Sequence, residues 1–412
     1  MEEESNYLKM EKILIISPEI YPKIKVGGLG KMVAGVAEEL KKKGAEIKVV
    51  SPQKEIYFPL FQKKTEFSYR RLGVEGAELC LTSNWQPDWL WIHDWGGVWA
   101  AESFLRKLGT NKAKVLWTIH SPVGENYGYE YSYGQPGEGD LINWGDSFFD
   151  FAGLVEKGIK MSHRITTVSP SFSRSLSRHK LFAGAKSIIG IANGVDAEEW
   201  NPRTDRLIDL KLKNSWLEFK KKNKQILQQK FALPEKEVPV FAFVSRIVPQ
   251  KGMELLLKVL PKFVGQNDLQ FVFVGAGQKN LVQKIFRLGQ RFPDKIGLKL
   301  VADFDLPHQV FAGADFLVLP SVSEPFGIVV AEARKYGVIP IVHLVDGLKD
   351  QVKDGQNGFG FQKYQKEKLE EKLYQALGSW QSEWQKKRLG DWAGIESWQK
   401  VTRKWLEVFS EC

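Results

Sequence analysis

Apolar residues form short runs along the chain, and these runs alternate with longer segments in which apolar residues recur at helical spacing. In Phe316–Leu319 four apolar residues follow one another, which is typical of a strand buried on both faces of a parallel sheet. The helical segment that begins near Leu29 ends at Lys-Lys-Lys-Gly, residues 41–44. The pattern predicts an α/β protein with strands at Lys12–Ser17, Ile47–Val50, Val115–Ile119, Ile165–Ser169, Val238–Ser245, Leu269–Val274, Ile296–Val301, Phe316–Leu319 and Ile339–His343.

Length and composition indicate a globular protein with more than one domain. The 412 residues exceed what one ordinary core holds, so we expect two doubly wound domains. No apolar run approaches the ~20 residues of a membrane span, and the acidic start lacks the layout of a secretion signal. The two cysteines, Cys80 and Cys412, lie far apart in sequence, which favours a reducing, cytoplasmic setting and excludes a metal site built on cysteine.

The net charge of +10 raises the question of a nucleic-acid partner. Much of the excess lies in residues 211–230, where Trp216, Phe219, Ile226 and Leu227 are interleaved with lysines. This spacing favours the solvated face of an amphipathic helix. No nucleic-acid-binding motif supports the other interpretation, and a positive surface also suits anionic substrates.

The stretch 321–332 carries the first candidate for a binding site. Glu324 follows a buried strand and therefore lies at the carboxyl edge of a sheet, where such folds bind ligands. Pro325 fits the first position of a helix, so the amides of Phe326 and Gly327 would form an anion site at the helix N-terminus. Glu332 would lie about 10 Å along that helix. The pattern suits a nucleotide sugar, or else a solvent-facing Glu and an N-terminal Glu that complements the helix dipole.

The first predicted βαβ unit has glycines, Gly27 and Gly28, at its first turn, where backbone amides can approach a ligand. The full G-x-G-x-x-G pattern is absent, so a tight turn without a ligand remains an equal alternative. Asp94 and His120 end strand-like runs and are candidates for the same edge of the sheet. The tyrosine-rich segment 124–145 fits either an acceptor-binding loop or an irregular surface hairpin, which we favour slightly.

Two cationic side chains flank the turn after the first strand of the second half. Arg246 and Lys251 can hold two faces of a phosphate there, although a pair of surface charges has the same appearance. Asp303 and Asp305 imitate a metal-binding Asp-x-Asp pair. Because they precede Pro307 and a helical pattern, capping of that helix is the favoured interpretation.

Taken in order, these motifs resemble those of the glycogen/starch synthase family. The family's glucosyl-donor motif Lys-x-Gly-Gly-Leu is matched by Lys25-Val26-Gly27-Gly28-Leu29. Further motifs are matched by His93-Asp94-Trp95, Thr118-Ile119-His120, Thr166–Pro170, Asn193–Asp196, Trp200-Asn201-Pro202 and Ser245–Gly252. The pair Glu324 and Glu332 resembles the Glu-x7-Glu motif of retaining glycosyltransferases.

The resemblance covers nearly the whole chain and implies the GT-B fold. This fold has two Rossmann-like, doubly wound domains that face an interdomain cleft, here 1–200 and 201–393. A C-terminal helix, here within 394–412, returns to the first domain and presents Trp398, Val401, Trp405 and Val408 on one face. The family requires no metal and no other cofactor.

The resemblance also implies transfer of glucose, with retained configuration, from ADP-glucose or UDP-glucose to the non-reducing end of an α-1,4-glucan. The implied catalytic residues are His120, Arg246, Lys251, Glu324 and Asp94. The implied donor-binding residues are Lys25, Gly27, Gly28, Phe326, Gly327 and Glu332. Among these, Arg246 and Lys251 would bind the pyrophosphate, Glu324 the glucose hydroxyls and Glu332 the ribose hydroxyls.

The chain departs from the family pattern at two positions. Lys31 stands where the family usually has an acidic residue, and Ser121 stands where Asn commonly follows the motif histidine. Two alternatives remain open. One is another retaining GT-B transferase, which would form a sucrose-like, trehalose-like or surface glycan product. The other is a non-catalytic glucan-binding protein.

Overall fold

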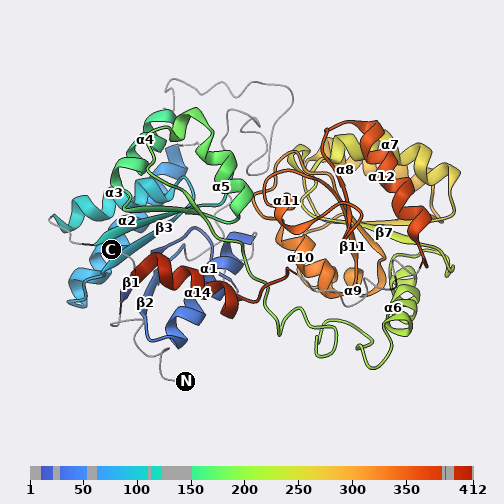
Figure 1. Cartoon of the computed structure of the whole chain (residues 1–412), viewed down its shortest axis with the longest axis horizontal. Helices are drawn as coiled ribbons and strands as arrows, with labels where there is room; N and C mark the ends of the chain where they lie inside the picture. The colour runs from blue at the N-terminus through green and yellow to red at the C-terminus, as the bar shows by residue number, and fades with distance from the viewer. Residues whose placement is uncertain are drawn as a thin grey trace. The chain divides into compact units, whose positions relative to one another are not determined.

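The computed structural model describes residues 11–21, 28–52, 63–109, 113–122, 151–382, 386 and 394–410. Contacts divide the chain into two compact units. Unit 1 contains Met1–Gly194 and Glu396–Cys412, and unit 2 contains Val195–Ile395. Each unit is built around its own sheet with helices on both sides (Figure 1).

Unit 1 contains a parallel six-stranded sheet in the order β2-β1-β3-β4-β5-β6. All residues of β3 are buried, as expected for a strand covered on both faces. The four strands that the apolar runs predicted in this half are confirmed. The strands are β1 (Lys12–Ile16), β2 (Glu46–Val50), β3 (Trp89–His93), β4 (Lys114–Ile119), β5 (Arg164–Thr167) and β6 (Ile189–Gly190).

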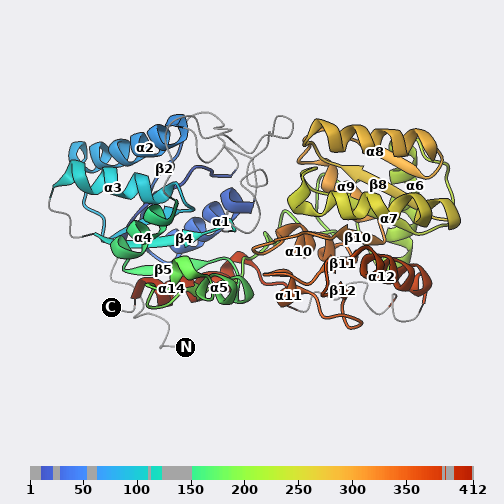
Figure 2. The same cartoon turned by 90° about the horizontal axis from the view of Figure 1, so that it is seen from above.

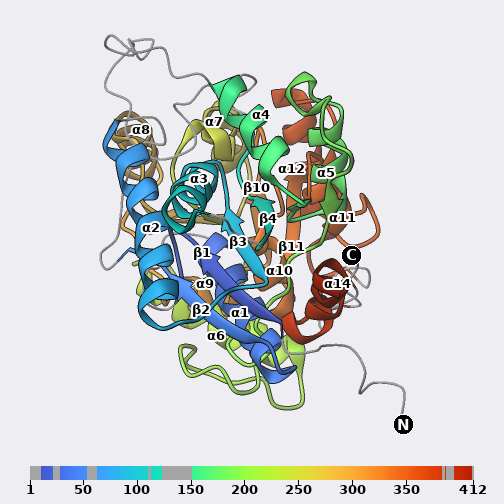
Figure 3. The ribbon, with the colours of Figure 1, turned by 90° about the vertical axis from the view of Figure 1, so that its left-hand side faces the viewer.

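Helices α2 and α3 pack together on one face of this sheet, and α14 lies on the opposite face (Figure 2). Figure 3 shows the strands of unit 1 running between these helix layers. The helices of unit 1 are α1 (Gly28–Lys42), α2 (Lys63–Thr82), α3 (Gly97–Leu108), α4 (Phe151–Met161), α5 (Pro170–Ser177), the 3-10 turn η3 (Lys180–Phe182) and α14 (Trp398–Ser410).

The C-terminal helix α14 packs on unit 1 through the apolar face that its sequence predicted. Trp398 covers Gly35 of α1 so closely that an added Cβ would lie 2.5 Å from the indole ring. Trp405 contacts Trp91 of β3, with ring centroids 4.9 Å apart. The helix thus contacts both the first helix and a central strand of unit 1.

Unit 2 contains a second parallel six-stranded sheet, in the order β12-β11-β10-β7-β8-β9. Every residue of β7, β8, β10 and β11 is buried, which is why the sequences of these strands are mostly apolar. The five strands predicted for this half are confirmed. The strands are β7 (Val240–Val244), β8 (Gln270–Val274), β9 (Ile296–Lys299), β10 (Phe316–Leu319), β11 (Ile339–His343) and β12 (Phe359–Phe361).

The first helix of unit 2, α6, precedes β7, and the other helical elements follow the strands in sequence. The helical elements of this unit are α6 (Trp216–Lys230), the 3-10 turn η4 (Pro249–Lys251), α7 (Met253–Gln266), α8 (Lys279–Arg291), α9 (Leu306–Gly313), α10 (Ile328–Lys335), α11 (Leu348–Gln351) and α12 (Lys366–Ser379). None of the helices in the described ranges is long and apolar enough to cross a membrane.

The basic segment forms the amphipathic helix α6, as predicted, and Lys221 and Lys222 are exposed on it. Two other lysines of the helix point inward, which the sequence analysis did not foresee. Lys220 donates to the carbonyl oxygens of Phe311 and Ala314 at the end of α9. Lys224 forms an ion pair of 2.7 Å with the buried Asp315.

Both sheets reverse their strand order at one point. In unit 1 the reversal lies between β1 and β3, and in unit 2 it lies between β7 and β10. At such a point the loops after two adjacent strands leave in opposite directions, which opens a crevice at the carboxyl edge. The loops that follow these strands are therefore the first place to look for a site.

Candidate functional site

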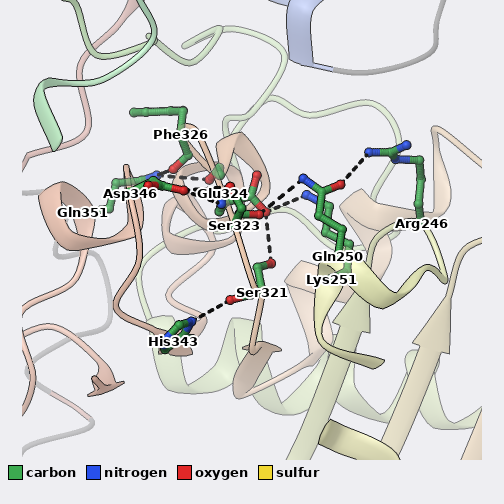
Figure 4. Close-up of polar contacts among 11 residues, drawn as sticks. Arg246, Gln250, Lys251, Ser321, Ser323, Glu324, Phe326, His343, Asp346 and Gln351 are labelled. Atoms are coloured by element: carbon green, nitrogen blue, oxygen red, sulfur yellow. Dashed lines mark hydrogen bonds and ion pairs between the residues drawn. The ribbon is translucent and has the colours of Figure 1, made fainter. Parts of the chain in front are cut away.

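In unit 2 the structure brings Lys251 and Glu324 together, although they are 73 residues apart in sequence. Lys251 ends the η4 turn after β7, and Glu324 lies in the loop after β10. Their Nζ and Oε2 atoms are 2.6 Å apart, with only 12% and 9% of the two side chains exposed. Ser321 donates to the same carboxylate oxygen at 3.1 Å. Figure 4 shows this pair at the centre of a larger polar network.

Arg246 follows β7 directly and reaches the same network through Gln250. Its Nη2 donates to Oε1 of Gln250 at 3.4 Å, and Nε2 of Gln250 donates to the carbonyl oxygen of Ser323 at 3.4 Å (Figure 4). Gln250 therefore joins the loop that carries the two cations to the loop that carries Glu324. The sequence analysis did not single out Gln250, although it lies between the two predicted cations.

A second acidic residue, Asp346, holds the backbone of the Glu324 loop. Its Oδ2 accepts from Ser323 Oγ at 2.8 Å and from the amide of Glu324 at 3.2 Å. The amide of Gly347 in turn donates to the carbonyl oxygen of Glu324 at 3.0 Å. Sequence reasoning missed Asp346. The Asp-Gly pair shortly after β11 was the available signal, because such pairs mark tight turns at strand ends.

The prediction that a helix begins at Pro325 is wrong, because α10 begins three residues later, at Ile328. Gly327 precedes it with φ of 85°, a left-handed conformation that interrupts any helix. Gln351 stabilises this path, because its side-chain amide donates to the carbonyl oxygens of both Phe326 and Gly327. The first helix amides thus belong to Ile328 and the residue after it, instead of Phe326 and Gly327.

Glu332 consequently lies closer to the start of its helix than predicted. It is four residues past Ile328, about 6 Å along the axis instead of about 10 Å. Its side chain is buried, and the residue is only 5% exposed. The alternative of a solvent-facing Glu is wrong, because Glu324 is also buried, at 7%.

In unit 1 the carboxylate of Asp94 shapes the loop that carries His120. Its Oδ1 accepts from the amides of His120 at 3.3 Å and Ser121 at 3.1 Å, and its Oδ2 accepts from Ser121 Oγ at 2.7 Å. Burial raises the pKa of Asp94, and these hydrogen bonds oppose that rise. Ser121, one of the departures from the family pattern, is thus a partner of Asp94.

His120 follows β4 and contacts His93, the last residue of β3. Nδ1 of His93 and Nε2 of His120 are 3.0 Å apart. Desolvation lowers the pKa of His120 to about 3. It also lowers the pKa of His93, which the neighbouring imidazole lowers further. Both rings are therefore neutral at neutral pH.

Some of the remaining predicted residues lie within the described ranges, and others lie outside them. Gly28 is the first residue of α1, whereas Lys25 and Gly27 lie outside the described residues, as does the tyrosine-rich segment 124–145. Asp303 accepts from the amides of Asp305 and Leu306 at 2.9 and 2.8 Å, which confirms the capping interpretation for Asp303. Asp305, which is at the N-cap position of α9, makes no side-chain cap hydrogen bond. No group of three or more potential metal ligands occurs among the described residues.

Comparison with known proteins identifies two family profiles on the chain. The profile described as "Starch synthase catalytic domain" matches residues 12–74 and 54–189. The profile described as "Glycosyl transferases group 1" matches residues 223–388. Together they span most of both units.

The relatives and the solved structures agree with these profiles. A glycogen synthase of Kosmotoga olearia is 30% identical over 97% of this chain and 97% of its own length. A glycogen synthase of Cellvibrio japonicus is 28% identical over 97% and 99%. The catalytic domain of starch synthase IV from Arabidopsis thaliana, bound to ADP and acarbose, has a TM-score of 0.81 at 22% identity and covers 97% of this chain and 98% of that chain. The fold is thus GT-B, and the chain belongs to the glycogen/starch synthase family of glycosyltransferases.

Proposed function

We propose that this glucosyltransferase uses ADP-glucose as its donor and extends the non-reducing end of an α-1,4-glucan with retention of configuration. The buried ion pair of Lys251 with Glu324 carries the proposal, because it fixes a cation and a carboxylate side by side at the strand-order reversal of unit 2. The ADP bound to the starch synthase from Arabidopsis thaliana supports the choice of nucleotide. UDP-glucose is the competing donor, since a structurally similar Anabaena protein was solved with UDP and glucose.

In unit 2, Lys251 and Arg246 would bind the diphosphate of the donor. One N–H of Lys251 is committed to Glu324, which leaves two donors on its ammonium group. Fixed positive groups stabilise the charge that develops on a leaving phosphate, an effect often worth several kcal/mol. The first amides of α10, which begins at Ile328, would add a further anion contact.

The two glutamates would hold the sugars of the donor. Oε2 of Glu324 accepts from Lys251 and Ser321, whereas its Oε1 has no hydrogen bond within the described part of the chain. Oε1 is therefore the oxygen that would accept from a glucose hydroxyl. Glu332, on α10, would accept from the ribose hydroxyls.

In unit 1, His120 would contact the reacting glucose, and Asp94 would act by holding the His120 loop. Lys25, Gly27 and Gly28 would contact the donor from the same unit. The acceptor hydroxyl would attack the anomeric carbon from the face that the diphosphate leaves. The departing phosphate oxygen would take the hydroxyl proton, so that configuration is retained without a covalent enzyme intermediate.

The test is a donor panel with a defined acceptor. The purified chain is incubated with labelled ADP-glucose or UDP-glucose and glycogen, and the product is digested with an α-1,4-specific amylase. We expect label to enter glycogen from ADP-glucose and to be released by the amylase. An Arg246→Ala variant, which lacks one diphosphate cation, should lose most of this activity.

Each failure has a separate meaning. A higher kcat/KM for UDP-glucose would overturn the donor assignment alone. Label that resists the amylase would indicate another retaining transferase. Glucan binding without turnover from either donor, with no difference between Arg246→Ala and the unmodified chain, would overturn the catalytic proposal.

A further inference from the structure

The contact between His93 and His120 also bears on which nitrogen atoms of the two rings carry protons. Because both imidazoles are neutral, each carries one N–H and one lone pair. Nδ1 of His93 lies 3.0 Å from Nε2 of His120, so one of these two atoms must donate to the other. The direction of this hydrogen bond decides where the second proton of the pair lies.

The surroundings of His93 decide between the two directions. His93 is fully buried, and its Nε2 has no hydrogen-bond partner among the residues that the structure describes. If Nε2 carried the proton, a buried N–H would lack an acceptor, which is rare in folded proteins. A buried lone pair without a donor is tolerated more often. The proton of His93 therefore belongs on Nδ1, which donates to His120.

Packing sets the plane of the His93 ring, and the hydrogen bond with His120 sets which ring atom faces that residue. Trp91 packs against it with ring centroids 4.8 Å apart, and Trp91 is itself packed against Trp405 of α14. Rotating the His93 ring by half a turn would place a carbon against Nε2 of His120 and would remove the only polar contact that His93 makes through its side chain among the described residues. The ring orientation and the proton position thus support the same arrangement.

We propose that His93 is a positioning residue that donates from Nδ1 to Nε2 of His120 and so fixes His120 as the tautomer with its proton on Nδ1. Within the described part of the chain, His120 makes no other side-chain hydrogen bond. It therefore presents an N–H donor at Nδ1, at the carboxyl edge of β4. This inference rests on the proposed role of His120 and sharpens it: His120 donates to a substrate oxygen and does not accept from a hydroxyl.

The direct test is the tautomer of His120 in the full chain. The sequence has only six histidines, so selective 15N-histidine labelling gives few signals, and His120→Gln identifies the signal of His120. Long-range 15N–1H spectra distinguish a protonated from an unprotonated ring nitrogen. We expect Nδ1 of His120 to be protonated and Nε2 to be unprotonated. The reverse assignment in the unmodified chain would overturn the proposal.

Two variants then separate positioning from simple packing. His93→Leu removes the donor, whereas His93→Asn keeps an amide group near Nδ1. We expect His93→Leu to lose the tautomer preference and to lower kcat about 10-fold with little change in donor KM. In His93→Asn, kcat should follow the measured fraction of His120 that is protonated on Nδ1.

The outcomes are distinguishable from one another. Activity that does not follow the tautomer across these chains would overturn the positioning role. Thermal melting shows whether each variant folds, and if His93→Leu does not fold, the unmodified chain and His93→Asn still decide the question. The spectra need no substrate, so failure of every donor would overturn the proposed function without altering the tautomer result.

Discussion

Gly252 lies where the loop that carries Lys251 contacts the loop that carries Glu324. Its replacement by alanine should disrupt the Lys251–Glu324 ion pair. The residue joins the η4 turn to α7 with φ of +75°, a left-handed conformation. A Cβ there would lie 1.8 Å from the carbonyl oxygen of Pro320 and 2.5 Å from its carbonyl carbon. Pro320 directly precedes Ser321, so the two backbones touch where the loop after β7 ends and the loop after β10 begins.

The expected loss of stability in Gly252→Ala has two contributions. Alanine in the left-handed region costs roughly 1–2 kcal/mol relative to glycine. The carbonyl oxygen must also retreat by about 1.5 Å to reach an ordinary contact, and overpacking of this kind costs roughly 1–3 kcal/mol. Because the obstacle is backbone, no side-chain rotation relieves it. We expect Gly252→Ala to lower the free energy of unfolding by about 2–5 kcal/mol.

Gly355 offers a matched control in the same unit. Its φ is +72°, but a Cβ there would have no atom within 4 Å. Gly355→Ala therefore carries the conformational cost without the collision and should lower the free energy of unfolding by roughly 1–2 kcal/mol. Chemical denaturation of both variants measures the difference, and the control removes any contribution that unit 1 makes to the transition.

The donor KM distinguishes disruption of the Lys251–Glu324 pair from a general loss of stability. Pushing Gly252 away from Pro320 separates Lys251 from Glu324, so the donor KM should rise in Gly252→Ala and remain unchanged in Gly355→Ala. Equal destabilisation of the two variants, or an unchanged donor KM in Gly252→Ala, would refute the reasoning that this contact sets the geometry of the pair.

Three further predictions concern buried charges and hydroxyl groups. Lys251→Met leaves the Glu324 carboxylate buried without its cation, so we expect the free energy of unfolding, measured by chemical denaturation, to fall by roughly 3–5 kcal/mol. The double variant Lys251→Met, Glu324→Gln should recover much of this loss, because it has no buried charge at this position. Desolvation lowers the pKa of Lys220 to about 7, whereas an unfolded lysine titrates near 10.4. The unfolded chain therefore binds more protons from about pH 7 to about pH 10, so stability should rise with pH by up to about 1.4 kcal/mol per unit, and Lys220→Met should flatten that rise. Tyr336→Phe removes the hydroxyl that donates to the buried Asp205 and should lower the free energy of unfolding by roughly 1–3 kcal/mol, measured in the same way.

Each of these predictions has an outcome that contradicts it. For Lys251, a double variant no more stable than Lys251→Met would show that the loss does not come from the unpaired carboxylate. For Lys220, parallel pH–stability curves of the variant and the unmodified chain would show that its ammonium group keeps its proton in the fold. For Tyr336, unchanged stability would show that water replaces the hydroxyl at no cost.

The sequence predicted the strands well and the local start of α10 poorly, for a common physical reason. The strands of unit 2 are buried on both faces, so their apolar character is a property of the segment itself. The path of 324–327 instead depends on Gln351, a residue of another element, which binds the carbonyl oxygens of Phe326 and Gly327. A local signal such as Pro325 does not predict a contact with a residue that lies elsewhere in the sequence.

The same distinction applies to the side chains of the candidate site. Arg246, Lys251 and Glu324 were predictable because each follows a recognisable buried strand. Asp346 and His93 act on other residues, namely on the backbone of Glu324 and on the ring of His120. Asp346 belongs to none of the motifs, and the motif that contains His93 does not indicate its contact with His120, so only the three-dimensional arrangement shows these two roles.

Topology explains why the predicted cations and carboxylate meet at all. The strand order of unit 2 reverses between β7 and β10, so these strands are neighbours although β8 and β9 separate them in sequence. The loops after β7 and β10 carry Lys251 and Glu324, and the ion pair closes across the reversal. In unit 1 the reversal lies between β1 and β3, and the chain after β1 leads into Gly28 while the chain after β3 begins with Asp94. One rule of parallel sheets thus selects a candidate loop pair in each unit, and Gly28, Asp94, Lys251 and Glu324 all lie in these loops or at their ends.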